Sequence, residues 1–129
     1  MPKARQLTLW VADQPGMLGD IAGALGAKKT NIVALMGATE GGRGAVRMVV
    51  DKPATARKVF TANGWQFTEE EVLTVTLSDT PGTLGKVAAK LGRAGVNIDY
   101  IYAGSAGSAR KLNAYMGVSD LKSALRAAR

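Results

Sequence analysis

The chain has 129 residues, of which 47% are hydrophobic, and a formal net charge of +7. This length suits one ordinary domain or two very small ones, and the apolar fraction is enough for a packed core, which argues against a disordered chain. The sequence contains neither cysteine nor histidine, which excludes disulfides and thiolate catalysis and removes the commonest general base and metal ligand.

The N-terminus and the spread of charge predict a soluble, cytoplasmic protein. The opening "MPKARQLTLWVAD" is basic but lacks an apolar segment of signal-peptide length. No apolar run approaches the roughly 18 residues of a transmembrane helix. The basic residues are scattered, with no run longer than two, so they predict a solvated surface rather than a nucleic-acid interface.

The elements of the first half follow from the spacing of apolar residues. Residues 6–12 alternate as a strand does and are followed by helical spacing that ends near Lys28. We expect Pro15 to be the first helical residue, because proline lacks the N–H that this position cannot use. The later elements are strands at 31–39 and 44–50 joined by an "EGGR" hairpin, a helix at 53–63 and a short closing strand at 65–67.

The second half repeats this order. A strand at 72–77 leads to a helix that starts at Pro81 and ends near Gly95. The remaining elements are strands at 97–104 and 110–118 and a helix at 119–129 with Ser119 as its N-cap.

Two stretches, residues 13–32 and residues 79–98, are nearly the same sequence. Ten of their twenty positions are identical at an offset of 66 residues (79 minus 13). This period is too long for a solenoid unit and fits a small two-layer domain. The identical pairs are Asp13/Asp79, Pro15/Pro81, Gly16/Gly82, Leu18/Leu84, Gly19/Gly85, Ala22/Ala88, Leu25/Leu91, Gly26/Gly92, Asn31/Asn97 and Ile32/Ile98.

The element order predicts an α+β fold of two ferredoxin-like βαββαβ units in tandem, residues 1–70 and 71–129, with antiparallel strands and helices on one side. The second unit lacks its last strand, because the sequence ends at Arg129. The strand at 72–77 would then have a bare edge, and such edges are normally paired or blunted. We expect either a second chain or residues 3–6 to pair with it.

A ferredoxin-like fold is compatible with several functions. An enzyme is not expected, because no nucleophile with a base and an orienting group can be assembled, and no cofactor or metal site is indicated. An RNA-binding module would stack bases on aromatics of its middle strands, but strands 44–50 and 110–118 hold only Tyr115. Tyr100 and Tyr102 share a face of the preceding strand, where packing explains them equally well. A small-ligand sensor is favoured over both.

The repeated turn offers groups that could hold an amino acid. The glycine of each turn lets a ligand approach the backbone closely. The N–H groups of residues 16–18 and 82–84 lack intrahelical acceptors and lie at the positive end of a helix dipole, which suits a carboxylate. Asp13 or Asp79 could accept from an ammonium group. The same residues also fit a plain strand-to-helix turn capped by the aspartate, and the sequence leaves both interpretations open.

The repeated pattern resembles the ACT domain, in which Asp/Asn-x-Pro-Gly-x-Leu follows the first strand and Asn-Ile opens the second. The resemblance covers residues 6–129 and implies the tandem form, in which two copies share one chain. ACT domains are regulatory modules that bind amino acids, often between two copies. The resemblance therefore implies a non-catalytic, allosteric regulatory protein with an amino-acid ligand.

Similarity to the regulatory domain of phosphoglycerate dehydrogenase implies particular ligand-binding residues. In that relative the loop residue before the Pro-Gly pair and the asparagine of the second strand contact the bound amino acid. The resulting candidates are Asp13, Pro15, Gly16, Met17, Leu18, Asn31 and Ile32 in the first copy and Asp79, Pro81, Gly82, Thr83, Leu84, Asn97 and Ile98 in the second. The ligand side chain is expected near Met36, Tyr100 or Tyr102.

This sequence departs from that relative in ways that affect specificity. The loop residue is aspartate rather than asparagine, so an ammonium acceptor is kept and an amide donor is lost. Val11 and Leu77 stand where the relative has a polar residue. The resemblance therefore does not carry serine specificity over to this chain.

The expected partners follow from the same resemblance. We expect a small-molecule amino acid and a homodimer, with a metabolic enzyme or regulator controlled in trans, and neither nucleic acid nor membrane. The alternative is a ligand-free ACT scaffold that dimerises or recruits a partner protein. Unequal use of the two turns would be visible where Met17 differs from Thr83 and Asp20 differs from Lys86.

Overall fold

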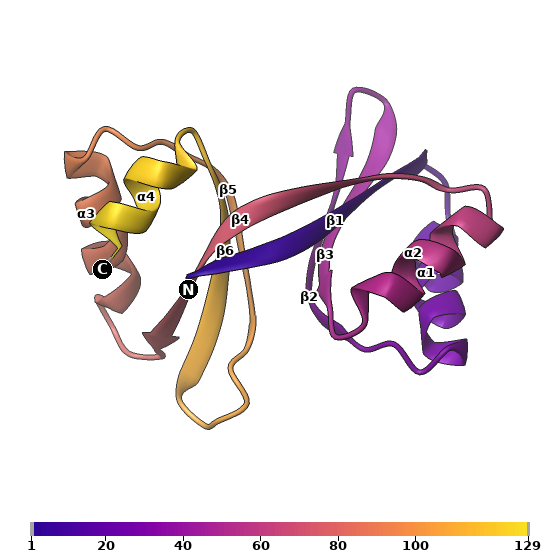
Figure 1. Ribbon diagram of the computed structural model, residues 1–129, viewed down its shortest axis with the longest axis horizontal. Helices are drawn as coiled ribbons and strands as arrows, with labels where there is room; N and C mark the ends of the chain where they lie inside the picture. The colour runs from indigo at the N-terminus through magenta and orange to yellow at the C-terminus, as the bar shows by residue number, and fades with distance from the viewer. Residues whose placement is uncertain (1, 129) are drawn as a thin grey trace. The chain divides into compact units, whose positions relative to one another are not determined.

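The computed structural model describes residues 2–128. They form an α+β fold with a six-stranded antiparallel sheet and four helices (Figure 1). The strands hydrogen-bond in the order β2-β3-β1-β4-β6-β5. In chain order the elements are β1 (Lys3–Ala12), α1 (Met17–Ala27), β2 (Ile32–Glu40), β3 (Arg43–Val50), α2 (Pro53–Ala62), β4 (Gln66–Ser78), α3 (Thr83–Arg93), β5 (Ile98–Ser105), β6 (Lys111–Val118) and α4 (Leu121–Ala127).

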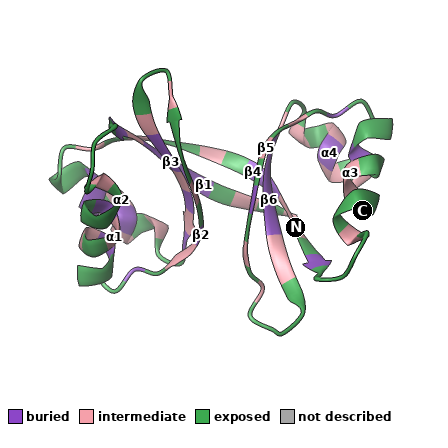
Figure 2. Ribbon diagram, turned by 180° about the vertical axis from the view of Figure 1, so that it is seen from behind, coloured by how far each residue is buried: buried purple, intermediate pink, exposed green. Residues whose placement is uncertain are grey.

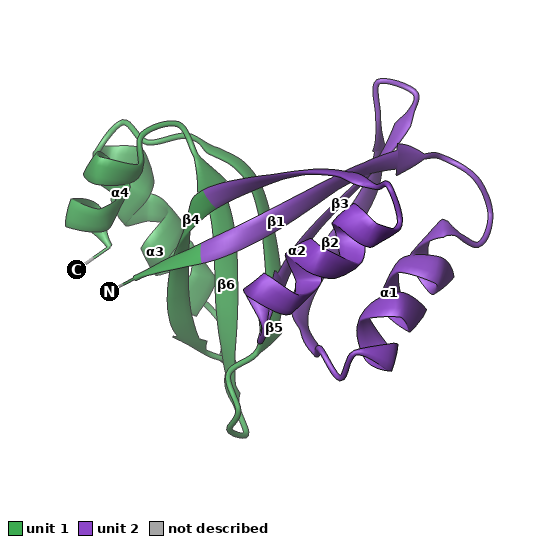
Figure 3. Ribbon diagram, turned by 45° about the vertical axis from the view of Figure 1, so that its right-hand side comes forward, with its two compact units in different colours: residues 1–4, 71–129 green, residues 5–70 purple. Residues whose placement is uncertain are grey.

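The chain divides into two compact units, which Figure 3 distinguishes by colour. Residues 5–70 contain α1 and α2 and are called the 5–70 unit below. Residues 2–4 join residues 71–128, with α3 and α4, in what is called the 71–128 unit. The long strands β1 and β4 therefore each contribute residues to both units.

The 5–70 unit buries its core between its strands and its two helices. The alternation of β1 places Leu7 and Leu9 on one face, where they are buried with Ile21 and Leu25 of α1 and with Phe60 of α2. Figure 2 shows buried segments, in purple, on both the strands and the helices of this unit. The predicted period of two in the strand and of 3.6 in the helices is confirmed by this burial.

The 71–128 unit has a core of its own. Leu73 and Leu77 of β4 are buried with Leu91 of α3, Met116 of β6 and Ala124 of α4. Its strand β4 pairs with β6, and β6 pairs with β5, all antiparallel. The strands predicted at 97–104 and 110–118 are confirmed as β5 and β6, each within one residue at its start.

The prediction of two short strands separated by the charged segment "TEEE" is wrong, because β4 runs through this segment without interruption. The backbone stays extended through this segment, because the three glutamates have partners on β1 at the same level of the sheet. A charged residue on a strand is tolerated where a cross-strand partner offsets it. The partners are Thr8 for Glu70 (Oγ1 to Oε1, 2.9 Å), Arg5 for Glu69 (Nη1 to Oε1, 3.6 Å) and Lys3 for Glu71 (Nζ to Oε2, 3.1 Å).

The start of the chain pairs with the edge of β4 that the sequence appeared to leave bare. The N–H of Thr74 donates to the carbonyl of Pro2 at 3.0 Å, and residues 2–4 belong to the 71–128 unit. Of the two alternatives stated above, pairing by the N-terminal segment is therefore the one observed. It begins one residue earlier than the expected segment 3–6.

Helix α4 begins later than predicted, because a different residue caps it. Asp120, rather than Ser119, is the N-cap, and its Oδ1 accepts from the N–H of Ser123 at 3.1 Å. Hydrogen bonds from the hydroxyl and then the N–H of Ser123 lower the pKa of Asp120. The Ser119 hydroxyl instead accepts from the N–H of Asn97 at 2.9 Å, so it holds the start of β5.

A glycine in β6 makes room for an aromatic ring on the neighbouring strand. Gly117 pairs with Tyr100, and a Cβ at Gly117 would lie 2.2 Å from Cε2 and Cζ of that ring. We expect Gly117→Ala to lower the free energy of unfolding by about 1–3 kcal/mol, the usual cost of overpacking, as measured by urea denaturation. Adding Tyr100→Ala should remove most of the penalty. Wild-type stability in Gly117→Ala would show that the ring is not held over this position.

Candidate functional site

The repeated Pro-Gly pairs form type II β-turns rather than the first residues of helices. The N–H of Met17 approaches the carbonyl of Gln14 at 3.4 Å, and Gly16 has φ 91° and ψ −12°. This backbone fits the third residue of a type II turn, which needs positive φ and follows a favoured proline. The second turn is the same, with φ 89° and ψ −12° at Gly82.

The prediction that Pro15 and Pro81 start the helices is therefore wrong. Gly16 and Gly82 are the N-caps, and the helices begin at Met17 and Thr83, two residues after the prolines. The first intrahelical bond of α1 runs from Asp20 N–H to the Gly16 carbonyl (3.0 Å), and α3 has the equivalent bond. The N–H groups of Met17 and Thr83 donate within their turns. Each helix start therefore has fewer free N–H groups than the three predicted.

Neither repeated aspartate caps its helix, so the plain capping interpretation is wrong. Neither N-cap has a side-chain hydrogen bond. Asp13 Oδ2 instead accepts from the hydroxyl of Thr39 on β2 at 2.8 Å. At the second turn the backbone N–H of Asp79 donates to the carbonyl of Arg110 at 2.6 Å. No side chain within residues 2–128 donates to the Asp79 carboxylate, so this carboxylate is available to a ligand.

The structure places the predicted asparagines far from the predicted aspartates. Within the 5–70 unit, β1 and β2 both run antiparallel to β3, so they run parallel to each other. Asp13 follows the end of β1, whereas Asn31 precedes the start of β2 at the opposite end. Asn31 N–H donates to Oδ1 of Asp51 at 2.8 Å. Asn97 is placed in the same way in the 71–128 unit, and one unit alone cannot bring such a pair together.

Each unit has a cavity beside its turn. The cavity at Asp79, called the Asp79 cavity, has a volume of about 390 Å³. The cavity at Asp13, called the Asp13 cavity, has a volume of about 310 Å³. Their linings correspond through the repeat and the β-sheet register, in the pairs Val11/Leu77, Asp13/Asp79, Leu18/Leu84, Gly37/Ala103, Gly44/Leu112 and Val46/Ala114.

The cavities contain part of the predicted set of site residues. Asp79, Leu84 and Tyr102 line one, and Asp13, Met17 and Leu18 line the other. The other predicted residues do not line them. Pro15, Gly16, Pro81 and Gly82 form the adjoining turns, Thr83 starts α3, and Asn31, Ile32, Asn97 and Ile98 lie at the far ends of β2 and β5; Met36 and Tyr100 are also outside the linings.

Apolar side chains near both cavities are exposed to solvent. Leu18 and Leu84 are each 48% exposed, and Leu35 and Ile101 are 40% and 38% exposed. These four form two pairs at the offset of 66 residues, one on the helices and one on the outer strands. The identity of Leu18 and Leu84 was visible in the sequence, but their exposure was not. A matched, exposed apolar surface is the kind that binds ligands or proteins.

Three linked hydroxyls, those of Ser78, Thr80 and Thr83, lie along the Asp79 turn. They were not predicted from the sequence. The hydroxyl oxygens of Ser78 and Thr80 are 3.2 Å apart, and those of Thr80 and Thr83 are 2.8 Å apart. The corresponding residues of the first turn carry no hydroxyl, since they are Ala12, Gln14 and Met17. Comparing the two repeats position by position would have revealed this difference.

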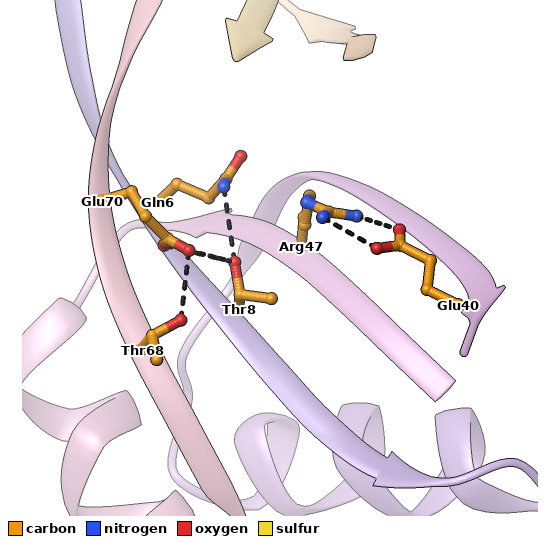
Figure 4. A network of polar contacts seen from close by, with 6 residues as sticks. All are labelled: Gln6, Thr8, Glu40, Arg47, Thr68 and Glu70. Atoms are coloured by element: carbon orange, nitrogen blue, oxygen red, sulfur yellow. Dashed lines mark hydrogen bonds and ion pairs between the residues drawn. The ribbon is translucent and has the colours of Figure 1, made fainter. Parts of the chain in front are cut away.

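The face of the 5–70 strands that points away from α1 and α2 carries a network of polar side chains. Both terminal nitrogens of Arg47 donate to the Glu40 carboxylate, the Nη2–Oε1 distance being 3.1 Å (Figure 4). The Arg47 guanidinium lies 5.8 Å from the ring centroid of Trp10. The remaining members of the network are Gln6, Thr8, Thr68 and Glu70. These groups satisfy one another, which is what buried polar residues such as Gln6 require.

The Glu40–Arg47 pair should make stability depend on pH. The hydrogen bond from Arg47 lowers the pKa of Glu40. Its stabilising contribution is therefore complete above the pKa of the unfolded chain and is lost as pH falls through the lower folded pKa. Urea denaturation should show Glu40→Gln less stable than wild type at neutral pH, with a smaller difference at acidic pH. A difference that is independent of pH would contradict this.

Metal and membrane signals are not found within residues 2–128. No group of three or more acidic side chains there is arranged to hold a metal ion. None of the helices in this range has the length and apolar character that a bilayer crossing needs.

The family match coincides with the 71–128 unit. Residues 72–126 match the family model of the ACT domain. The Asp79 turn, its hydroxyls and its cavity all lie within the matched residues. None of the curated proteins matches the chain in sequence.

Solved structures confirm the fold over almost the whole chain. Protein BT0572 from Bacteroides thetaiotaomicron is 25% identical, with a TM-score of 0.87 over 98% of this chain and 86% of that one. The ligand-free regulatory subunit of aspartate kinase from Thermus thermophilus is 20% identical, with a TM-score of 0.67 over 99% and 91%. The corresponding subunit from Thermus flavus is 18% identical, with a TM-score of 0.64 over 99% and 95%. The fold of residues 2–128 thus resembles the folds of these solved structures.

Proposed function

We propose that the chain is a non-catalytic regulatory protein that senses an α-amino acid in the cytoplasm. The observation that carries the proposal is the cavity next to the available carboxylate of Asp79, just before helix α3 in the segment that matches the ACT domain. Its two units, residues 1–70 and 71–129, would then be ACT copies in tandem, each ferredoxin-like. The match to the ACT domain and the likeness to aspartate kinase regulatory subunits support this.

The Asp79 turn offers hydrogen-bonding partners for both the ammonium group and the carboxylate of an amino acid. Asp79 would accept from the ammonium group, and charge-assisted hydrogen bonds of this kind are the stronger ones. The hydroxyls of Ser78 and Thr80, with the first free N–H groups of α3, would donate to the carboxylate. Binding would act on a partner enzyme or regulator in trans, because a ligand shifts a population only through different affinities for its states.

A thermal-shift panel of the twenty amino acids tests this proposal. A ligand at 100 times its Kd adds about 2.7 kcal/mol to the free energy of unfolding. For a chain of this size the melting temperature should rise by roughly 10 °C. Glycinamide, which lacks the carboxylate, is a suitable negative control. If no amino acid at millimolar concentration raises the melting temperature, the sensor proposal is wrong.

A second candidate function is a scaffold that dimerises or recruits a partner without a ligand. The four exposed apolar side chains favour it, since they occur as two matched pairs. A site that includes both an aspartate and an asparagine of the repeat would need a second ACT copy, because each unit holds these groups at opposite ends. A second chain can supply that copy, and we expect a homodimer.

Light scattering of the two outer-strand variants tests the dimer. Leu35→Glu and Ile101→Glu each place a charge on an outer strand without removing a buried side chain. We expect at least one of them to shift the wild-type dimer to a monomer. Lys58→Glu, at an exposed position of α2, is the control. A wild-type monomer at high micromolar concentration would rule out the dimer.

A further inference from the structure

We propose that the two turns are unequal, and that the Asp79 cavity takes an α-amino acid with an uncharged aliphatic side chain. The proposal rests on the function proposed above and specifies its ligand. The Asp13 cavity, in contrast, would serve the fold. The argument uses the charges of the linings, their apolar walls and the partners of the two aspartates.

The charge of the Asp79 cavity excludes ligands with charged side chains. Asp79 is the one lining residue that carries a charge at neutral pH. An acidic ligand would bring a second carboxylate to this cavity, whose lining contains neither lysine nor arginine. A basic ligand would have two cationic groups competing for one carboxylate, and a desolvated, unpaired charge is costly. The remaining choice is an amino acid whose side chain is neutral.

The walls of the cavity then favour an aliphatic side chain. Leu77, Leu84, Ile101 and Leu112 contribute apolar surface from four elements. Leu84 and Ile101 are partly in solvent, so a ligand that covers them removes apolar surface from water. The polar lining groups, Ser78 and Thr80 with Asp79, gather at the end of β4, where the backbone groups of an amino acid would sit.

The hydroxyls supply donors for the ligand carboxylate. Ser78 and Thr80 line the cavity, and Thr80 is linked to Thr83 at the start of α3. A hydroxyl can rotate to donate to a carboxylate while accepting from its neighbour. This chain of three therefore places donors next to the carboxylate of Asp79, to which no side chain within residues 2–128 donates.

The Asp13 cavity differs at each of these points. The Asp13 carboxylate already accepts from Thr39 at 2.8 Å. The residue that corresponds to Thr39 is Ser105, whose hydroxyl instead accepts from the N–H of Gly107 at 3.1 Å, away from Asp79. The position of the apolar Leu112 is held by Gly44, so part of the wall is missing. The two turns therefore share one backbone conformation but differ in the groups that a ligand would contact.

Isothermal titration calorimetry with L-leucine tests the proposal on the full chain. We expect Asp79→Asn to weaken binding by about tenfold or more, the scale of one charge-assisted hydrogen bond. The matched variant Asp13→Asn should change the Kd by less than about twofold. Two probes dissect the ligand, since 4-methyl-2-oxopentanoate lacks the ammonium group and L-lysine and L-glutamate carry charged side chains. All three should bind at least about tenfold more weakly than L-leucine.

A second pair of variants covers the case in which Asp79→Asn does not fold. Thr83→Met should weaken L-leucine binding, whereas Met17→Thr should leave it unchanged, with folding of both checked by circular dichroism. Equal losses at the two turns, or tighter binding of L-lysine or L-glutamate than of L-leucine, would overturn the inference while leaving an amino-acid sensor. Absence of binding by every amino acid would remove the proposed function and the inference together.

Discussion

Replacing Phe60 with alanine should lower the free energy of unfolding by about 3–5 kcal/mol, the range for removing a buried aromatic ring. Phe60 is fully buried at the centre of the 5–70 core. Its ring centroid lies 5.5 Å from that of Phe67 and 6.3 Å from that of Trp65. The substitution therefore removes ring contacts as well as transfer free energy, and it leaves a cavity that the two neighbouring rings line.

Urea denaturation followed by tryptophan fluorescence measures this effect, because Trp65 borders the lost ring. Lys58→Ala is the matched control, since this exposed residue lies on the same helix α2. Surface substitutions usually change stability by less than about 0.5 kcal/mol. A loss below about 1 kcal/mol in Phe60→Ala would show that the aromatic cluster does not hold this unit together.

Replacing Gly82 with valine should abolish ligand binding and lower the free energy of unfolding by about 1–3 kcal/mol. A Cβ at Gly82 would meet no atom within 4 Å, so the cost comes from the backbone and not from a clash. The φ of 89° lies in the left-handed region, which a β-branched residue strongly disfavours. The turn would open and move the hydroxyls and the first N–H groups of α3 away from Asp79.

Two control variants distinguish a loss of ligand binding caused by the Gly82 turn from a general loss of stability. Gly85→Ala adds a methyl group within α3, again with no atom within 4 Å of the added Cβ, and should be neutral or stabilising by up to about 1 kcal/mol. Gly16→Val strains the equivalent turn at φ 91° and should cost as much stability as Gly82→Val. We expect Gly16→Val to keep L-leucine binding, and unchanged binding in Gly82→Val would show that the second turn is not the site.

Most of the fold could be predicted, because apolar spacing is a property of neighbouring residues. The alternation at Leu7 and Leu9 and the helical spacing from Ile21 to Leu25 both report burial on one face. The continuity of β4 could not be predicted in this way. Glu69, Glu70 and Glu71 resemble a solvated linker, and their partners on β1 lie more than sixty residues away in the sequence.

The sequence predicted the two turns but not their detailed geometry, and the site itself stays a prediction. The Asp-x-Pro-Gly repeat indicated the turn, and the structure puts both aspartates at cavities. The helix start was misjudged because Pro-Gly suits a type II turn as well as a first helical turn, and the two differ in ψ at the proline and φ at the glycine. The Thr39–Asp13 bond joins residues 26 apart, so only the folded chain shows that one aspartate is occupied.

A crystal structure grown with the amino acid that gives the largest thermal shift tests the central claim most directly. The account predicts ligand density in the Asp79 cavity, with the ammonium group at the Asp79 carboxylate, the ligand carboxylate at Ser78 and Thr80, and an aliphatic side chain against Leu84 and Ile101. An Asp79 cavity that stays empty at a saturating concentration, or density at a different place in the chain, would contradict it.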